Sequence, residues 1–249
     1  MKKYKKLLIK LSGEAISDST KKEVFNYQAI EYISDEILKL KELGMQISII
    51  IGGGNIFRGK GAEVWNIERA EADNIGMLGT IINSLMLKAA FKAKSSYEIR
   101  VMTATPMEAF AEPYIRLKAI NYLDKGYIVI FAGGIGQPYV TTDYPAVQRA
   151  IETHCDAIFV AKNGVNGVFS NDPKQNKEAK LYKTLAYEDF ITKKLDVMDN
   201  SAILLAQKYN LPIHIFNFNK LNIMTDICKG LDIGTYVSPT TEQIEYEEN

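Results

Sequence analysis

Cysteine and histidine, the residues that build disulfides and most zinc sites, are scarce in this sequence. The 249 residues include two cysteines and two histidines. Cys155 and Cys228 lie in apolar contexts without C-x-x-C spacing, which is typical of buried, reduced thiols in a cytosolic protein. His154 and His214 form no ligand pattern with the cysteines, so we expect no zinc site, and His214 is expected to be an ordinary strand residue.

The sequence also lacks a net charge and long apolar runs. Its 30 basic residues balance 30 acidic ones, so neither a nucleic acid nor an anionic membrane is an expected partner. No apolar run approaches the roughly 20 residues that a membrane-spanning helix needs. Lys10 interrupts the apolar stretch after the basic start, so we expect no secretion signal. These absences favour a cytoplasmic protein that binds a small ligand or another protein.

Short apolar runs rich in β-branched residues alternate with longer amphipathic patterns. This alternation is typical of βαβ crossovers, and it predicts a three-layer αβα sandwich around a mostly parallel sheet. The predicted strands are Lys6–Leu11, Gln46–Ile51, Glu98–Thr103, Tyr127–Ala132, Ala157–Ala161 and Pro212–Phe216. The predicted helices are Tyr27–Leu43, Ala72–Lys94, Pro113–Lys125, Tyr144–His154 and Asp199–Tyr209.

Two further segments depart from this rhythm, and neither divides the chain. Val165–Pro173 carries Asn-Gly between apolar pairs and ends at a proline, which predicts a hairpin or elbow. The acidic tail Glu242–Asn249 is expected to be frayed. Because no internal repeat or Pro/Ser-rich linker interrupts the sequence, we expect residues 1–249 to form a single domain.

The most informative motif is Ile49–Gly59, in which an apolar run leads into three glycines and an arginine. Glycines expose backbone N–H groups and tolerate positive φ, so this motif predicts a phosphate site. Arg58 is one of only five arginines, and its alternative role is a surface ion pair. A second run, Ile128–Gly136, also ends in glycines. In parallel sheets ligands gather at the carboxyl edge, where these loops are expected to converge.

Two common nucleotide-binding motifs are disfavoured. Gly54–Lys60 fits the P-loop pattern, but Gly61 replaces the Ser or Thr that would bind magnesium. The dinucleotide fingerprint fails as well, because Phe57 and Tyr139 stand where the third glycine is needed. Lys10 is a lysine in an apolar strand, which is costly to bury without an anionic partner. We therefore expect Lys10 to face a ligand, unless its strand lies at a sheet edge.

Five ordered blocks of this sequence together resemble the amino acid kinase family and, within it, the uridylate kinase branch. They extend over essentially the whole chain, to about Ser238, and are Lys10–Glu14, Gly52–Gly59, Asp73–Leu78, Gly133–Asp143 and Gly167–Pro173. The resemblance implies transfer of a phosphoryl group from ATP to UMP. It also implies a homohexamer assembled through early helices. Magnesium is expected to arrive with ATP, because the sequence has no dense carboxylate cluster that would supply a metal site from the protein.

The same resemblance assigns roles to individual residues. Lys10, Arg58 and Asp143 are the expected catalytic residues: Lys10 tracks the transferred group, Arg58 receives the UMP phosphate, and Asp143 orients Lys10 or meets magnesium. The implied ATP site consists of Lys10, Leu11, Ser12, Gly13, Gly54, Arg58, Asn163, Phe169 and Asp172. The implied UMP site consists of Gly53, Asp73, Ile135, Gly136, Gln137, Pro138, Tyr139, Val140, Thr141 and Thr142, with Asp73 accepting hydrogen bonds from the ribose.

Without the resemblance, ordinary structural roles stay open for several of these residues. Asp143 could cap the helix that follows it, Asp73 could be a carboxylate near a helix start, and Phe169 could belong to the core. Two positions also depart from the family pattern. Asn166 replaces the usual aspartate of the hairpin, and Ser17–Tyr27 lacks the usual glycines, so activation by GTP is not carried over. Inhibition by UTP is an expectation from the family alone.

Two other functions are compatible with parts of this pattern. Another amino acid kinase, acting on a carboxylate or carbamate, would share Lys10 and the glycines but would have no use for Arg58 and Asp73 around a nucleotide. A non-catalytic nucleotide-binding or storage oligomer of the same fold would have no need of Lys10 and Asp143 to track a moving phosphoryl group.

Overall fold

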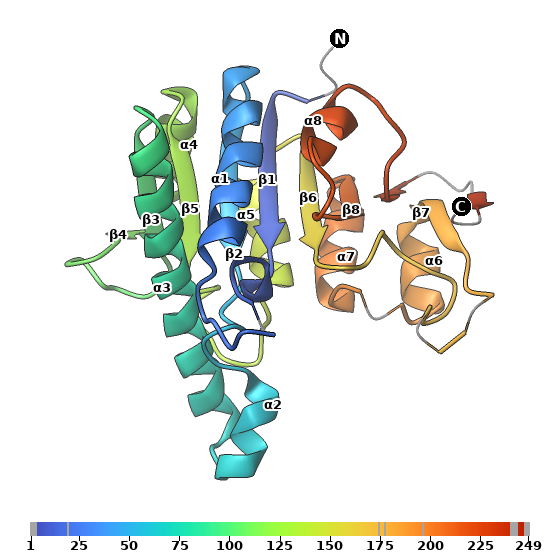
Figure 1. The fold of residues 1–249 in the computed structure, drawn as a ribbon, viewed down its shortest axis with the longest axis horizontal. Coiled ribbons are helices and arrows are strands. Elements are labelled where there is room, and N and C mark those ends of the chain that lie inside the picture. The colour runs from blue at the N-terminus through green and yellow to red at the C-terminus, as the bar shows by residue number, and fades with distance from the viewer. Residues whose placement is uncertain are drawn as a thin grey trace.

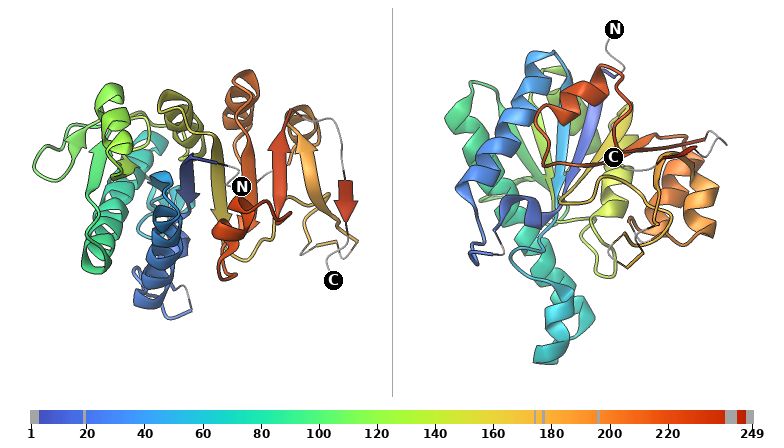
Figure 2. Two further views of the ribbon diagram at one scale, coloured as in Figure 1. Left: turned by 90° about the horizontal axis from the view of Figure 1, so that it is seen from above. Right: turned by 45° about the vertical axis from the view of Figure 1, so that its right-hand side comes forward.

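The computed structural model describes residues 4–18, 20–173, 175–176, 178–195, 197–239 and 244–246. These residues form a ten-stranded sheet in the order β10-β7-β9-β8-β6-β1-β2-β5-β3-β4. Helices cover both faces of the sheet (Figures 1 and 2). The predicted three-layer αβα sandwich is therefore confirmed.

The strands from β4 to β8 in this order all run parallel, whereas β9 is antiparallel to β8 and β10 is antiparallel to β7. All six predicted strands are present to within one residue at either end. The full set is β1 (Lys6–Leu11), β2 (Gln46–Ile51), β3 (Ile99–Thr103), β4 (Glu112–Pro113), β5 (Ile128–Ala132), β6 (Ala157–Lys162), β7 (Leu181–Ala186), β8 (Ile213–Asn217), β9 (Thr235–Ser238) and β10 (Ile244–Tyr246).

The helices lie in two layers. α1, α3 and α8 pack on one face of the sheet, and α4, α5, α6 and α7 pack on the other (Figure 2). Their bounds are α1 (Tyr27–Glu42), α2 (Gly59–Ala62), α3 (Arg69–Lys94), α4 (Arg116–Asp124), α5 (Asp143–Glu152), α6 (Tyr187–Thr192), α7 (Asn200–Lys208) and α8 (Ile223–Cys228), with 3-10 turns η1 (Gly13–Ile16) and η2 (Glu63–Trp65).

Each central strand contributes side chains to two separate cores. In β1, Leu7 and Ile9 point into the core under α1 and α3, whereas Leu8 points into the core under α5. Burial on both faces explains why the central strands read as continuous apolar runs rather than alternating ones. Lys10 shares the face of Leu8, because side chains alternate along a strand. The buried lysine therefore lies on the α5 side of the sheet.

Several predicted boundaries are wrong. The helix predicted from Pro113 begins at Arg116, because Glu112–Pro113 pairs with β3 as the edge strand β4, where proline is tolerated. α3 begins at Arg69, before the predicted Ala72. Part of the predicted frayed tail forms β10, which pairs with β7. The rest of that tail lies outside the described residues.

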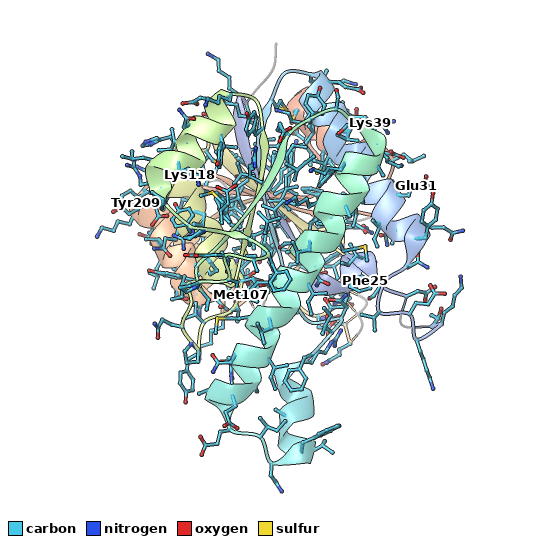
Figure 3. The ribbon with its side chains drawn as sticks, turned by 90° about the vertical axis from the view of Figure 1, so that its left-hand side faces the viewer. Phe25, Glu31, Lys39, Met107, Lys118 and Tyr209 are labelled. Carbon is cyan, nitrogen blue, oxygen red and sulfur yellow. The ribbon has the colours of Figure 1, made fainter. Side chains whose placement is uncertain are left out.

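The longest helix, α3, extends beyond the sheet at its N-terminal half, together with α2 (Figures 1 and 3). Within the described part of the chain, α3 is the helix that is long and apolar enough to cross a membrane by length and composition. Core helices of globular proteins pass the same test, and α3 packs against α1 and β3. Its N-terminal half carries the first part of the candidate site.

Candidate active site

The carboxyl ends of the central strands bring the predicted loops to one edge of the sheet. β1 lies between β2 and β6, and β2 lies beside β5, all in parallel register. Gly52, at the end of β2, donates its N–H to the carbonyl of Leu11 at the end of β1 (3.0 Å). Gly53 and Gly54 after β2 and Gly134 after β5 line one hollow at this edge, so these two glycine loops converge as predicted.

A buried ion pair lies at this edge. The Lys10 ammonium is 2.5 Å from Oδ1 of Asp143, the first residue of α5. Both residues are 7% exposed. Since β1 is a central strand, the alternative of an edge lysine facing water is excluded. A simple capping role for Asp143 does not explain its geometry either, because its carboxylate faces Lys10 and accepts the N–H of Asp199 through Oδ2 (3.2 Å).

The surroundings keep the Asp143 carboxyl ionised. Burial alone would raise its pKa, but the positive charges of Lys10 and Lys162 and the Asp199 N–H outweigh the desolvation and hold the pKa below its ordinary value. A buried carboxylate with two lysines near it creates a region in which added negative charge is stabilised. This is the property that a site for phosphate chemistry requires.

Sequence reasoning missed two residues of this centre. Lys162 ends β6, and its ammonium donates to the carbonyl of Val197 (2.5 Å). Asp199 precedes α7 and accepts a hydrogen bond from the Thr141 hydroxyl (2.5 Å). The segment before α7 thus joins the predicted loop to Asp143. The available signal was a second lysine at the carboxyl end of a buried strand, matching Lys10 in β1.

A hollow of about 490 Å³ opens beside this centre, between the ends of β2 and β5 and the start of α3. Seven predicted residues line it: Gly53, Gly54, Arg58, Asp73, Val140, Thr141 and Thr142. Its walls also include Glu14, Phe57, Arg69 and Thr80, which sequence reasoning did not assign to the site. The structure therefore joins the first, second, third and fourth sequence blocks in one concave surface.

Arg58 is ion-paired within this hollow. Its Nη2 is 2.6 Å from Oε1 of Glu14, and its Nε donates to the carbonyl of Gly54 at 3.3 Å. The guanidinium is more than half exposed, so it is accessible to a ligand that enters the hollow. The ion pair that sequence analysis posed as the alternative to ligand binding is present, but it lies in the hollow rather than on an unrelated surface.

The glycines of the triple motif are needed for close packing rather than for unusual backbone angles. None of Gly52, Gly53 and Gly54 has positive φ, so these glycines do not make use of that freedom. A Cβ on Gly53 would lie 2.4 Å from the carbonyl oxygen of Gly76 in α3. In the second glycine loop Gly133 has φ of +72° and Gly136 has φ of +77°, where glycine is required.

Asp73 links α3 to the loop after β5. It accepts the Nε–H of Arg69 on both carboxylate oxygens (2.9 Å each) and the backbone N–H of Tyr139 on Oδ2 (2.7 Å). Tyr139 is 69% exposed. The end of the predicted uridine loop, Val140, Thr141 and Thr142, lines the hollow, whereas Ile135, Gly136, Gln137, Pro138 and Tyr139 lie in the same loop outside its walls. Asp73 thus holds the loop through the backbone of Tyr139.

Three of the predicted ATP residues, Asn163, Phe169 and Asp172, follow β6 on the other side of β1, whereas Gly54 and Arg58 line the larger hollow. Asn163 follows β6 and accepts a hydrogen bond from the Asn219 amide (2.9 Å). Phe169 forms an antiparallel bridge with Leu181, so Val165–Pro173 is an elbow rather than a tight hairpin, and Asp172 is exposed at its end. Next to it lies a second hollow of about 240 Å³, lined by Asn166, Leu181, Asn217, Lys220, Ile223, Asp232, Ile233 and Gly234.

The carboxylates of the site do not form a metal cage. Across the residues that the structure describes, no group of three or more His, Cys, Asp or Glu side chains is placed to hold a metal ion. Asp143 and Asp199 are the two carboxylates at the centre, joined by the Asp199 N–H.

Comparison with known proteins defines the class to which this arrangement belongs. The sequence profile of the amino acid kinase family matches residues 5–217. The chain therefore belongs to the amino acid kinase family, as the five blocks predicted.

The particular relatives that it resembles are uridylate kinases. The uridylate kinase of Frankia casuarinae is 47% identical over 245 residues, which are 98% of this chain and 94% of the relative. The solved structure of UMP kinase from Bacillus anthracis is 56% identical with a TM-score of 0.95, covering 98% of this chain and 99% of that one. UMP kinase from Ureaplasma parvum is 33% identical with a TM-score of 0.88, covering 94% and 98%.

Proposed function

We propose that this protein is a nucleoside monophosphate kinase that transfers the γ-phosphoryl group of ATP to UMP, giving ADP and UDP. The observation that carries the proposal is the buried Lys10–Asp143 pair. In the order of the sheet, β1 lies between the strands that border the larger hollow and those that border the smaller one. A lysine between two nucleotide-sized spaces suits a reaction in which a phosphoryl group passes from one nucleotide to another.

The transfer requires positioning and charge neutralisation more than covalent help from the protein. A phosphate oxygen of UMP forms the new bond to the γ-phosphorus while the bond to the bridging oxygen of ADP breaks, and its electron pair leaves with ADP. Lys10 follows the transferred group. The backbone after β1, at Leu11, Ser12 and Gly13, holds the ATP phosphates. Arg58 binds the UMP phosphate through its planar fork, with Gly54 between donor and acceptor.

The two nucleosides occupy opposite sides of this centre. Asp73 accepts hydrogen bonds from the ribose hydroxyls of UMP, and the loop from Ile135 to Thr142 contacts the uracil. Asn163, Phe169 and Asp172 border the ATP nucleoside. The 240 Å³ hollow adjoins them through Asn166 and supplies the remaining space for that end of ATP.

Magnesium enters with ATP in this proposal. When bound, it would supply positive charge that neutralises the phosphates. The donor set fits a cation held mainly by the nucleotide and water, because the centre offers only Asp143 and Asp199 as carboxylates and Asp143 already neutralises Lys10. A protein cage of three or more carboxylates would have pointed to a resident metal instead.

The test is ADP formation from ATP and magnesium with a panel of acceptors: UMP, CMP, dUMP, glutamate derivatives and carbamate. Activity confined to UMP is the expected result. Activity with a carboxylate or carbamate would identify another amino acid kinase. A failure to form ADP with every acceptor in the panel would favour a nucleotide-binding or storage oligomer.

We infer that the chain self-associates through α3 and that the assembly is a homohexamer in the cytoplasm. Ile75, Leu78 and Ile82 lie at helical spacing along α3 and are 37%, 48% and 46% exposed. An exposed apolar stripe on a helix is typical of a protein interface. Both cysteines are buried and neither forms a disulfide, which suits a reducing compartment.

A further inference from the structure

Arg69 occupies an unassigned place in the wall of the larger hollow. It lies in the first turn of α3, one helical turn before Asp73. Its Nε–H is shared between the two oxygens of the Asp73 carboxylate at 2.9 Å each. The Tyr139 N–H reaches the same carboxylate from the loop after β5 (2.7 Å). Asp73 is therefore oriented from its own helix and from the loop opposite.

The charges of the hollow give this contact a consequence for binding. Four charged side chains line it, and they form two ion pairs, Arg58 with Glu14 and Arg69 with Asp73. A nucleoside monophosphate brings a phosphate dianion into this space. Without Arg69, the Asp73 carboxylate would repel that dianion, and its orientation would depend on the Tyr139 N–H.

Hydrogen-bonding capacity remains on Asp73 after these contacts. An ionised carboxylate offers about four acceptor positions, and the donors at Asp73 are the Arg69 Nε–H and the Tyr139 N–H. A vicinal pair of sugar hydroxyls supplies two further donors. The hydrogen bonds already present fix the plane of the carboxylate, which determines where those hydroxyls must lie.

We propose that Arg69 is a positioning residue that makes Asp73 selective for a ribonucleotide. It orients the carboxylate and neutralises its charge, so that the 2′- and 3′-hydroxyls of the acceptor gain hydrogen bonds that a deoxyribonucleotide cannot make. The proposal rests on the proposed contact between Asp73 and the ribose of UMP. A purely structural role is a weak explanation for this pair, because the Arg69 side chain is 58% exposed and exposed i,i+4 pairs contribute little to stability.

The first test compares UMP with dUMP in the full-length wild type and in Arg69→Gln and Arg69→Lys. We expect kcat/KM for UMP to fall by about tenfold or more in Arg69→Gln, the loss of one hydrogen bond to a charged group. The value for dUMP falls less, so the UMP/dUMP ratio shrinks. Arg69→Lys restores part of the ratio, because it keeps the charge but not the fixed N–H geometry. Titration calorimetry with UMP or dUMP in the absence of ATP checks that the change is in acceptor binding.

The second test is a double-mutant cycle with Asp73→Asn. If Arg69 acts through Asp73, adding Arg69→Gln to Asp73→Asn changes the UMP/dUMP ratio no further. Additive effects would show that Arg69 acts on the ligand directly and would overturn the proposal. A reduced ratio in Asp73→Asn with a normal ratio in Arg69→Gln would overturn the positioning role alone. An unchanged ratio in Asp73→Asn would overturn the ribose contact and the positioning role together.

The matched control is Lys118→Gln on α4 (Figure 3), which removes another cation from a partly exposed ion pair, with Glu112. Neither residue lines the hollow. The control is expected to keep the wild-type UMP/dUMP ratio. Thermal unfolding of every variant separates altered selectivity from loss of the fold, and the partly exposed position of Arg69 predicts folded variants.

Discussion

At the scale of single residues, the centre of the site is a lysine and an aspartate buried together. Two charges taken out of water are tolerated only when each neutralises the other, and removing one partner typically costs about 3–5 kcal/mol. Lys10 and Asp143 meet this condition at 2.5 Å. The protein therefore keeps a neutralised charged pair in its interior, and a phosphoryl group is a ligand that such a lysine suits.

Lys10→Ala is expected to lower kcat by about a hundred- to a thousandfold, the usual effect of removing one stabilising group at developing charge. ATP binding is expected to be partly kept, because backbone amides after β1 also hold the phosphates. Steady-state kinetics and ATP titration measure the two effects. Lys10→Met/Asp143→Asn removes both charges and serves as the folding control. Turnover near the wild-type rate in Lys10→Ala would contradict the mechanism.

Ionisation of the Asp143 carboxyl makes the stability of the folded protein depend on pH. Its pKa in the folded protein lies below the ordinary value of 3.8, so ionisation stabilises the folded state above pH 3.8 and this contribution is lost as the pH falls through the lower folded pKa. Urea unfolding of the wild type and of Lys10→Met/Asp143→Asn should therefore differ by a constant amount between about pH 5 and pH 7. Below about pH 5 the wild type should lose stability relative to the variant. A stability difference that stays unchanged as the solution is acidified below about pH 4 would contradict this assignment.

Arg58→Ala is expected to raise KM for UMP by about ten- to a hundredfold, because a hydrogen-bonded charge on the phosphate is lost. Part of that effect comes from Glu14, which loses its partner and then repels the phosphate. Arg58→Ala/Glu14→Gln should accordingly bind UMP better than Arg58→Ala. Calorimetric titration with UMP measures both. Equal affinity in the two variants would show that Glu14 does not act on the ligand.

Sequence reasoning selected candidate site residues whose type is unusual in their local sequence, and it missed residues whose place in the candidate site comes from a distant neighbour. Lys10 in an apolar strand and Arg58 after three glycines are visible as anomalies. Glu14 and Asp199 are ordinary acidic residues of a loop or helix start. Only their contacts, with Arg58 and with Thr141 and Asp143, place them in the site.

At the scale of secondary-structure elements, the position of α3 depends on one glycine. Gly53 lies so close to α3 that a Cβ would be 2.4 Å from the Gly76 carbonyl oxygen and 3.1 Å from the Thr80 nitrogen. Backbone atoms of a helix cannot move aside as the end of a flexible side chain can. The glycine after β2 thus sets how near the helix that carries Asp73 approaches the sheet edge.

Gly53→Ala is expected to lower the free energy of unfolding by about 1–3 kcal/mol, the usual cost of overpacking, and to raise KM for UMP by displacing α3. Urea unfolding and steady-state kinetics measure the two effects. Gly61→Ala is the control, because a Cβ there meets no atom within 4 Å and its φ is not positive. If Gly53→Ala is as stable as the control, the close approach of α3 does not constrain the site.

Strands that are continuous apolar runs were predictable from the sequence. Strands that form only by pairing with a neighbouring strand were not. β1, β2, β5, β6 and β8 are apolar runs buried on both faces, so local composition identifies them. β7, β9 and the two-residue β4 carry polar residues and form because a neighbouring strand offers hydrogen bonds. Their existence depends on the assembled sheet.

At the scale of the whole molecule, the exposed stripe of α3 predicts self-association. Leu78→Asp is expected to dissociate the proposed homohexamer, because a charge buried at an apolar interface is unfavourable. Sedimentation velocity at micromolar concentration measures the assembly. Leu204→Asp, on an exposed apolar position of α7, is the matched control and should leave the assembly intact. A wild type that sediments as a monomer would contradict the inference.

The sequence by itself determined the layered fold, the buried strands, the glycine loops and the resemblance to the amino acid kinase family. These properties follow from the order and periodicity of apolar residues and from short motifs, which are local. Tertiary structure alone decided that Lys162 and Asp199 join the Lys10–Asp143 centre, that Glu14 pairs with Arg58, and that Gly53 must be bare because α3 packs against it. These contacts join residues from different elements, so they exist only once the chain has folded.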